Sequence, residues 1–394
     1  MKVVSTEKLP IKLWLDDIED GAMEQVRNLA NLPFAFKHIA VMPDSHQGYG
    51  MPIGGVMATK GVVIPNAVGV DIGCGMCAVK TSLTEIDTET LKKIMGEIRK
   101  QIPLGFNHHK EAQDRSLMPV NEQVTSPSNV WNSIVRQEYN AALKQIGTLG
   151  GGNHFIEIQK GSDGYVWIMI HSGSRNFGLK IAKYYNDLAV ELNEKWFSEV
   201  PKKWELAFLP LESNEGQDYL KEMQYAVDFA LANRKLMMDR ITDIFAGQYA
   251  PDDFIPLEFV NIAHNYAKME NHFGENVMVH RKGATLATED TIGIIPGSQG
   301  TKSYIVKGKG DRESFNSCSH GAGRRMGRKE AERTLNLEEE IKRLDDQGIL
   351  HAIRGIHDLD EAAGAYKPIG EVMRNQSDLV EILVELQPLA VIKG

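Results

Sequence analysis

The chain has 394 residues, of which 42% are hydrophobic and 25% are charged, a composition typical of a globular protein with enough apolar material for a core. No stretch approaches the roughly 20 apolar residues that a membrane-spanning helix requires, so we expect a cytoplasmic protein without a membrane partner. The formal net charge of -9 argues against indiscriminate binding to nucleic acid, because such binding depends on clustered Lys and Arg. An RNA partner would therefore need a local basic patch.

Hydrophobic periodicity predicts several helices along the chain. Apolar residues recur at helical spacing over residues 91–102, which predicts an amphipathic helix. The polar stretch 105–128 predicts a long surface loop, and such loops are often functional. Two further helices are expected near residues 181–192 and 220–245. A Glu-rich helix is expected over residues 335–347, with a solvated face.

Five short runs bounded by glycine predict strands, because they are apolar or alternate between apolar and polar residues. They are GYGMPIGGVMAT, YVWIMIHSG, VMVHRKGATL, TIGIIPG and KSYIVKG. No internal repeat is present. Strands and helices together predict a mixed α+β fold.

Six glycine-containing segments each carry a residue able to bind metal or phosphate: MPDSHQGYG, VDIGCGM, GGGNHFIE, HSGSR, AHNY and SHGAGRR. One such segment alone is weak support, since a lone buried histidine is more often a hydrogen-bonded core residue. Asp71 and Cys74 could meet one metal ion, and His154, His171 and His264 supply imidazoles. Mixed ligands on flexible glycine corners favour a catalytic metal site over a closed structural one. Ligand softness by itself favours zinc over manganese.

The cysteines point to reduced thiols rather than to a disulfide framework. Cys74, Cys77 and Cys318 are too few, and odd in number, for disulfides in a chain of this length. Cys77 forms a CxxC pair with Cys74, but a zinc ribbon needs a second pair that the sequence lacks. We interpret Cys77 as a small buried hydrophobic residue.

The segment SHGAGRR is typical of a phosphate-handling site. Small residues around His320 would let a nucleotide phosphate approach the backbone, and Arg324, Arg325 and Arg328 follow. Residues 320–333 hold five basic side chains, which makes this segment the best local basic patch. The alternative is a histidine in a tight turn ahead of a basic helix.

Other segments add possible phosphate contacts. Arg175 is a second candidate, because a guanidinium matches phosphate oxygens with two parallel hydrogen bonds. Ser298 and Ser303 could donate hydrogen bonds to phosphate, although a plain glycine turn is equally plausible.

The motifs DIGCGM, LGGGNHFIE, HSGSR, HNY, PGS and SHGAGR, followed by a C-terminal VIKG, resemble the RtcB family of GTP- and manganese-dependent RNA ligases, in the family's order from about residue 8 to Gly394. The resemblance implies one compact catalytic domain over residues 1–394, with a central β-sheet core, surrounding helices and a helical excursion at about 177–246. It implies an enzyme that joins RNA 3′-phosphate or 2′,3′-cyclic phosphate ends to 5′-hydroxyl ends, in tRNA splicing or RNA repair. The RNA would be tRNA halves or other cleaved RNA, and a need for an activating protein is left open.

The resemblance also implies roles for individual residues. His320 would attack the α-phosphate of GTP to form a histidine–GMP intermediate, and Asp44 would orient its imidazole. Two manganese ions would be bound by Asp71, Cys74, His154, His171 and His264, with Cys74 as the bridge. The guanine nucleotide would be held by Asn153, Glu157, Ser298, Ser303, Gly321, Ala322, Gly323, Tyr366 and Lys393. RNA phosphate would meet Arg175, Arg324 and Arg328.

Two other functions fit parts of the sequence. A two-metal phosphoesterase could use the same Asp, His and Cys ligands to activate water, but it would leave His320, Tyr366 and Lys393 without a role. A protein that only binds RNA or senses nucleotide is disfavoured by the net negative charge.

Overall fold

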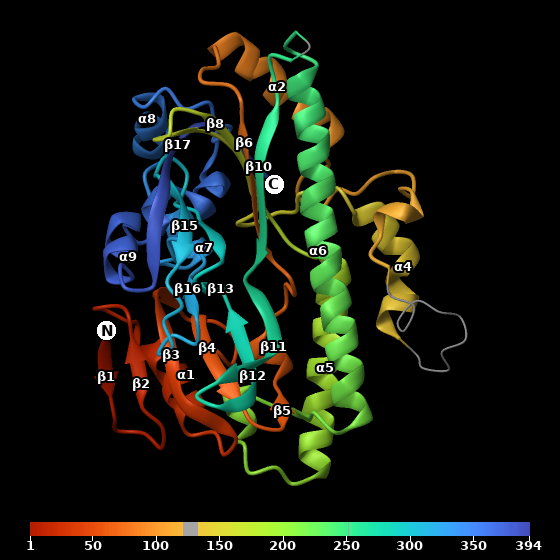
Figure 1. Ribbon diagram of the computed structural model, residues 1–394, viewed down its shortest axis with the longest axis vertical. Helices are drawn as coiled ribbons and strands as arrows, with labels where there is room; N and C mark the ends of the chain where they lie inside the picture. Colours follow the sequence, from red (N-terminus) through yellow and green to blue (C-terminus); the bar gives the residue numbers. More distant parts are fainter. Residues whose placement is uncertain (121–132, 251) are drawn as a thin grey trace.

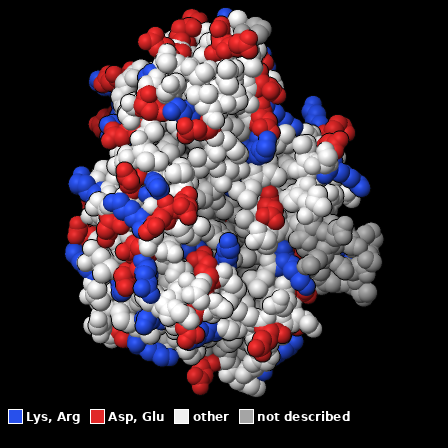
Figure 2. Space-filling view, in the orientation of Figure 1, with Lys and Arg blue, Asp and Glu red and all other residues white. Residues whose placement is uncertain are grey.

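The computed structural model describes residues 1–120, 133–250 and 252–394, and it has the mixed α+β architecture that the sequence predicts (Figure 1). Most strands of the described part belong to two sheets, and two long helices run side by side along one flank. Among the described residues, no helix is both long and apolar enough to cross a membrane. Acidic and basic side chains are interspersed on the face shown in Figure 2.

The first sheet has six strands, and its two faces are covered by different parts of the chain. Residues Ile39 and Val41 of β3 pack against α1, whereas Ala40 and Met42 point to the opposite face, because side chains alternate along a strand. The strand order is β1 (Lys2–Val4), β2 (Ile11–Leu13), β3 (Ala35–His46), β4 (Ile53–Thr59), β12 (Glu275–Lys282) and β11 (Asn265–His272). The covering elements are α1 (Asp20–Ala30) on one face and β13 (Ala284–Leu286), β16 (Ser317–Ser319) and α9 (Ile369–Asn375) on the other.

The second sheet has seven antiparallel strands and curls so that its outer strands β10 and β14 approach each other. Met76 and Ala78 of β6 face the inside of the curl, while Cys77 and Val79 pack against helices on the outside. The strand order is β10 (Pro256–Ala263), β6 (Gly75–Thr81), β8 (Val166–Ser172), β7 (Phe155–Gly161), β17 (Val380–Lys393), β15 (Ser303–Gly308) and β14 (Ile292–Ile295). Cys77 is fully buried, which confirms its interpretation as a core residue.

The predicted helices and strands are confirmed. The helices correspond to α2 (Thr88–Gln101), α5 (Arg175–Lys195), α6 (Asn214–Ala246) and α8 (Leu337–Asp345). The five predicted strand runs contain β4, β8, β12 with β13, β14 and β15. The sequence reasoning did not identify α1, α4 (Ile134–Gln145) or α9, and it considered α7 (Arg328–Thr334) only as the basic helix of the alternative interpretation of His320. The described part of the predicted loop, residues 105–120, holds only the short η2 (Arg115–Leu117), and residues 121–128 lie outside the described residues.

Short elements complete the described chain. They are β5 (Val62–Val63), η1 (Pro65–Ala67), η3 (Lys202–Trp204), β9 (Leu209–Pro210), η4 (Ile356–Glu361) and η5 (Ala363–Ala365).

Asn233 on α6 fixes the backbone of two loops. Its Oδ1 accepts hydrogen bonds from the N–H groups of Gly147, at 2.7 Å, and Thr148, at 3.1 Å. Its Nδ2 donates to the carbonyls of Thr148 and Gly173 and to Ser172 Oγ, at 3.1–3.2 Å. One loop leads to His154, just before β7, and the other follows His171 at the end of β8, so α6 supports both.

Arg234 continues this support into a third loop. Its side chain is fully buried, and Nη1 donates to the carbonyls of Gly73, at 2.9 Å, and Ser172, at 2.8 Å. Nε donates to Asn261 Oδ1 at 2.8 Å. The helical excursion therefore positions three loops around one point of the curled sheet.

Substitution Asn233→Ala is expected to lower the free energy of unfolding by about 3–5 kcal/mol, because several buried backbone groups lose a side-chain hydrogen-bond partner. Urea unfolding followed by circular dichroism measures the change. Gln224→Ala, at an exposed position of the same helix, is the control and should shift stability by at most about 0.5 kcal/mol. Equal stability of the two variants would contradict the supporting role.

Candidate functional site

A cleft with a volume of about 1030 Å³ is lined by residues of both large sheets and of the segment that leads into α7. Five of the sequence-predicted site residues with metal-binding or nucleophilic side chains meet in or directly beside it. They are Asp71, Cys74, His171, His264 and His320, all of which line the cleft.

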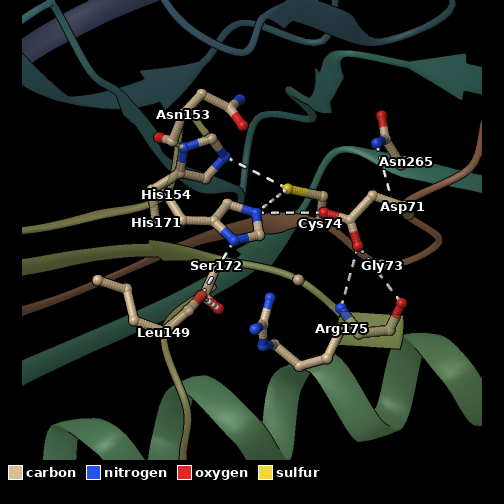
Figure 3. Close-up of polar contacts among 12 residues, drawn as sticks. Asp71, Gly73, Cys74, Leu149, Asn153, His154, His171, Ser172, Arg175 and Asn265 are labelled. Carbon is tan, nitrogen blue, oxygen red and sulfur yellow. Dashed lines mark hydrogen bonds and ion pairs between the residues drawn. The ribbon is translucent and has the colours of Figure 1, made fainter. Parts of the chain in front are cut away.

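The candidate metal ligands form two overlapping groups around Cys74. The sulfur lies 3.5 Å from His154 Nε2 and 3.3 Å from His171 Nε2, and His154 Nε2 lies 3.2 Å from Asp71 Oδ2 (Figure 3). One group consists of Cys74, His171 and His264, and the other of Asp71, Cys74 and His154. Within each group the ligand atoms lie within 4.8 Å of one another. A shared cysteine suits two neighbouring cations.

The histidines are oriented through their second ring nitrogen. His154 Nδ1 lies 3.0 Å from the carbonyl of Leu149, and His171 Nδ1 lies 2.9 Å from the carbonyl of Asn153 (Figure 3). A carbonyl only accepts, so each Nδ1 carries the proton and each Nε2 presents its lone pair to the cluster. This arrangement is usual for metal-bound histidines.

The electrostatics of the cluster also fit a cation. Burial lowers the pKa of His171 and His264 well below the usual value, with nearby histidines adding to the effect, and the neutral imidazole is the form that binds metal. Burial raises the pKa of the Cys74 thiol, and Asp71 raises it further. A coordinated cation would favour the thiolate. The donor set therefore fits divalent metal.

His320 is held by a fully buried carboxylate from another part of the chain. Asp44 Oδ2 lies 2.6 Å from His320 Nδ1 and accepts the backbone N–H groups of His320, at 3.0 Å, and Gly321, at 3.2 Å. Nδ1 therefore carries the proton, and Nε2 remains available to the cleft. The His320 and His264 rings lie edge to face with centroids 4.7 Å apart, so this histidine borders the candidate metal ligands.

Local backbone geometry explains how Asp44 reaches His320. The pairing of β3 with β4 shifts register between Val41 and His46, and such bulges redirect side chains. Gly323 has φ +72°, and a Cβ there would lie 2.1 Å from the carbonyl oxygen of Asp44, so only glycine permits this approach. Lys367 Nζ donates to the carbonyl of Ser45 at 2.6 Å and holds the bulge from the other side.

Most residues that the resemblance assigns to the nucleotide line the cleft. They are Asn153, Glu157, Ser298, Gly321, Ala322, Gly323, Tyr366 and Lys393. Burial raises the pKa of Glu157 to about 8, despite the opposing charge of Lys393. Ser303 differs, because its buried hydroxyl accepts from the Gly297 N–H, at 3.1 Å, and from Gln159 Nε2, at 3.2 Å, and it does not line the cleft.

The three arginines that the resemblance assigns to RNA phosphate lie in two different places. Arg324 and Arg328 line the cleft, and both contact Glu361, at 3.1 and 2.7 Å. Arg175 does not line it, and its guanidinium donates to Thr148 Oγ1, at 3.0 Å, and to the carbonyl of Gly105, at 2.8 Å. Its positive charge still acts on Asp71, whose pKa it helps to lower.

Sequence reasoning missed two residues that organise the site. Glu361 is nearly fully buried, binds both arginines and accepts from the Tyr366 hydroxyl. Asn265 donates to the carbonyl of Asp71 at 3.0 Å and accepts from the Gly283 N–H at 2.7 Å. Asn265 lies next to His264 in the segment AHNY, so a signal was present for it, whereas Glu361 follows no motif that we recognised.

Comparisons with known proteins point to one family. The family model described as "tRNA-splicing ligase RtcB" matches residues 25–394. The chain is 40% identical over 409 residues to "RNA-splicing ligase RtcB" of Escherichia coli K12, covering 100% of this chain and 99% of that protein. It is 34% identical to "tRNA-splicing ligase RtcB" of Nanoarchaeum equitans and 31% identical to that of Thermococcus kodakarensis, in both cases covering 98% of this chain and 95% of the relative.

Substitution Cys74→Ala is expected to weaken binding of divalent metal at least 10- to 100-fold, because both ligand groups share this sulfur. Metal content after dialysis, measured by mass spectrometry, tests the expectation. Cys77→Ala removes a buried thiol outside both groups and serves as the control. Full metal retention by the Cys74→Ala protein would rule out a shared ligand.

Proposed function

Because the chain belongs to the RtcB family, it is an RNA ligase, and we propose that it joins RNA 3′-phosphate or 2′,3′-cyclic phosphate ends to 5′-hydroxyl ends through a guanylated His320. The substrates are tRNA halves or other cleaved RNA, together with GTP. The whole chain, residues 1–394, acts as one catalytic domain.

The contact of His320 with Asp44 carries the proposal. A neutral imidazole whose Nδ1 proton is bound by a carboxylate has a free lone pair on Nε2, and it is a competent nucleophile near neutral pH. Nε2 attacks the α-phosphorus of GTP, an N–P bond forms, and the bond to the β-phosphate oxygen breaks to release pyrophosphate. The Nδ1 proton stays with the imidazole, and Asp44 stabilises the positive charge that develops there.

Two further steps complete the reaction. An oxygen of the RNA 3′-phosphate attacks the phosphorus of the GMP bound to His320. The N–P bond breaks, which releases RNA-(3′)pp(5′)G and restores the free imidazole of His320. The 5′-hydroxyl then attacks the phosphorus of the RNA 3′-phosphate, releases its proton to solvent and expels GMP as the new phosphodiester forms. A 2′,3′-cyclic phosphate is first hydrolysed to the 3′-phosphate.

The enzyme is metal-dependent, and we propose two Mn²⁺ ions as its cofactors. Cys74, His171 and His264 would hold one, and Asp71, Cys74 and His154 the other. Bound cations would neutralise charge on the triphosphate and on the reacting phosphates. The softness of cysteine and histidine also suits zinc, so the two metals should be compared directly.

The remaining cleft residues bind and orient the substrates. Glu157, Tyr366 and Lys393 would hold the guanine nucleotide, with Asn153, Ser298 and residues 321–323 around it. Ser303 would act indirectly, by fixing the backbone of Gly297 beside Ser298. Arg324 and Arg328 would bind RNA phosphate from the cleft, and Arg175 would do so from beside Asp71.

His320→Ala is expected to abolish covalent labelling of the protein by α-labelled GTP in the presence of Mn²⁺, because no nucleophile remains. The label on the unsubstituted protein should be acid-labile, and peptide mapping should locate it on His320. His357→Ala is the control, since the His357 side chain is 90% exposed and outside the cleft. Normal labelling of the His320→Ala protein would exclude the mechanism, and no labelling of the metal-loaded, unsubstituted protein would favour a phosphoesterase.

Asp44→Asn is expected to slow guanylation by about 100-fold or more while the fold is retained, because an amide can no longer fix the proton on Nδ1. Single-turnover labelling with GTP measures the rate. A rate within threefold of the unsubstituted protein would show that His320 does not need this carboxylate.

A further inference from the structure

One part of the cleft lining has no role in the steps above. It is formed by the segments 46–53 and 66–70 together with Lys282. Two apolar side chains line it and remain open to solvent, Tyr49 at 67% and Val70 at 49% exposure. An exposed aromatic ring alone is unremarkable, but here it lines the reaction cleft.

Hydrogen bonds hold the backbone of the turn that carries Tyr49, whereas the Tyr49 ring is exposed to solvent. Gln25 exchanges two hydrogen bonds with the backbone of Gly48, at 2.6 and 3.0 Å. The Gly50 N–H donates to Glu205 Oε2 at 3.1 Å, and a Cβ at Gly50 would lie 2.5 Å from the Glu205 carbonyl. The ring is thus presented from a backbone that is already ordered, which reduces the entropy lost on binding.

Lys282 joins the two segments of this wall. Its buried ammonium donates to the carbonyls of Tyr49, at 2.6 Å, and Asn66, at 2.9 Å, and its stem lies against Gly69, next to Val70. Two of its three N–H groups are used in these contacts. Lys282 therefore acts mainly as an anchor for the segments that display Tyr49 and Val70.

Charge in the cleft is distributed unevenly. Its basic residues are Lys282, Arg324, Arg328, Lys329, Arg333 and Lys393, and all except Lys282 lie in α7, in the segment before it, or at the C-terminus. The α7 side also holds the acidic Glu330 and Glu361, but its basic residues outnumber them, whereas the wall with Tyr49 neighbours the acidic Glu19 and Asp71 and has Lys282 as its one basic lining residue among the described residues. Strong phosphate binding belongs to the α7 side, and the Tyr49 side must use other contacts.

We propose that Tyr49, supported by Val70, is a stacking platform for the base of the first nucleotide of the 5′-hydroxyl RNA strand. Every base has a flat π face, so stacking on an aromatic ring holds a nucleotide without regard to sequence. This inference rests on the proposed ligase function.

The chemistry of the two RNA ends assigns them to the two walls. The 3′ end carries a phosphate and must reach the guanylate, so it suits the wall with Arg324 and Arg328. The 5′-hydroxyl end has no terminal phosphate, so contacts to its base and sugar contribute more to holding its first nucleotide than they do at the 3′-phosphate end. A wall with an aromatic ring and without an arginine matches that end.

The first measurement is the KM for a 5′-hydroxyl RNA strand in ligation to a 3′-phosphate strand. Tyr49→Ala should raise this KM about 5- to 100-fold, the range that loss of one base–aromatic stack gives, whereas Tyr49→Phe should restore it to within twofold. The KM for the 3′-phosphate strand should change much less. Tyr184→Ala, at a 44% exposed tyrosine of α5 outside the cleft, is the matched control.

A binding measurement keeps the inference testable even without ligation. The probe is a 5′-hydroxyl oligonucleotide with 2-aminopurine as its first base, whose fluorescence is quenched by stacking. Quenching by the unsubstituted protein that is lost in Tyr49→Ala supports the platform. An unchanged KM in Tyr49→Ala, or quenching only when the probe is in the 3′-phosphate strand, overturns it.

The two proposals fail in different ways. Absence of GTP labelling and of ligation in the unsubstituted protein would refute the guanylated histidine, while the 2-aminopurine experiment would still decide whether Tyr49 stacks on RNA. Normal labelling and ligation, with no effect of Tyr49→Ala on KM or quenching, would refute the platform alone.

Discussion

The hydrogen bond between Asp44 and His320 is the contact on which the arrangement of the cleft depends. It joins residues 276 positions apart in the chain and draws the segment 320–323 against a bulge in β3. The same oxygen accepts two backbone N–H groups, so the contact fixes main chain as well as imidazole. Arg324 follows Gly323 directly in the sequence. The same contact therefore also positions the start of the basic segment that leads into α7.

Near this contact, two buried polar side chains of α6 hold the loops of the site by hydrogen bonds. Arg234 is fully buried, and its Nη1 bonds two carbonyls of the loops that carry the metal-ligand cluster. Asn233 holds a third segment of the same region. Unpaired groups of this kind would be costly, and their mutual pairing makes the helical excursion part of the site although it contributes no ligand to it.

Glu361 has a comparable effect on the phosphate side. It pairs with Arg324 and Arg328, and Lys393 and the arginines hold its pKa below the usual value against the effect of burial. Glu361 therefore holds the guanidinium groups of Arg324 and Arg328 in place before substrate binds. The chain has a net charge of -9, and acidic and basic side chains are interspersed on the face in Figure 2, so the positive charge on this side of the cleft comes from locally paired arginines.

The sequence alone determined the chemistry of the site and the regular elements, because both depend on local patterns. Helical periodicity located α2, α5 and α6, a Glu-rich composition indicated α8, and glycine-bounded runs located five groups of strands. Residue type and motif singled out the candidate metal ligands and His320, which the structure brings close together. Only the tertiary structure decided that Ser303 faces away from the cleft, that Arg175 lies outside it, and that Glu361 and Tyr49 line it. Those outcomes depend on strand register, a bulge and contacts between distant segments, which no local pattern encodes.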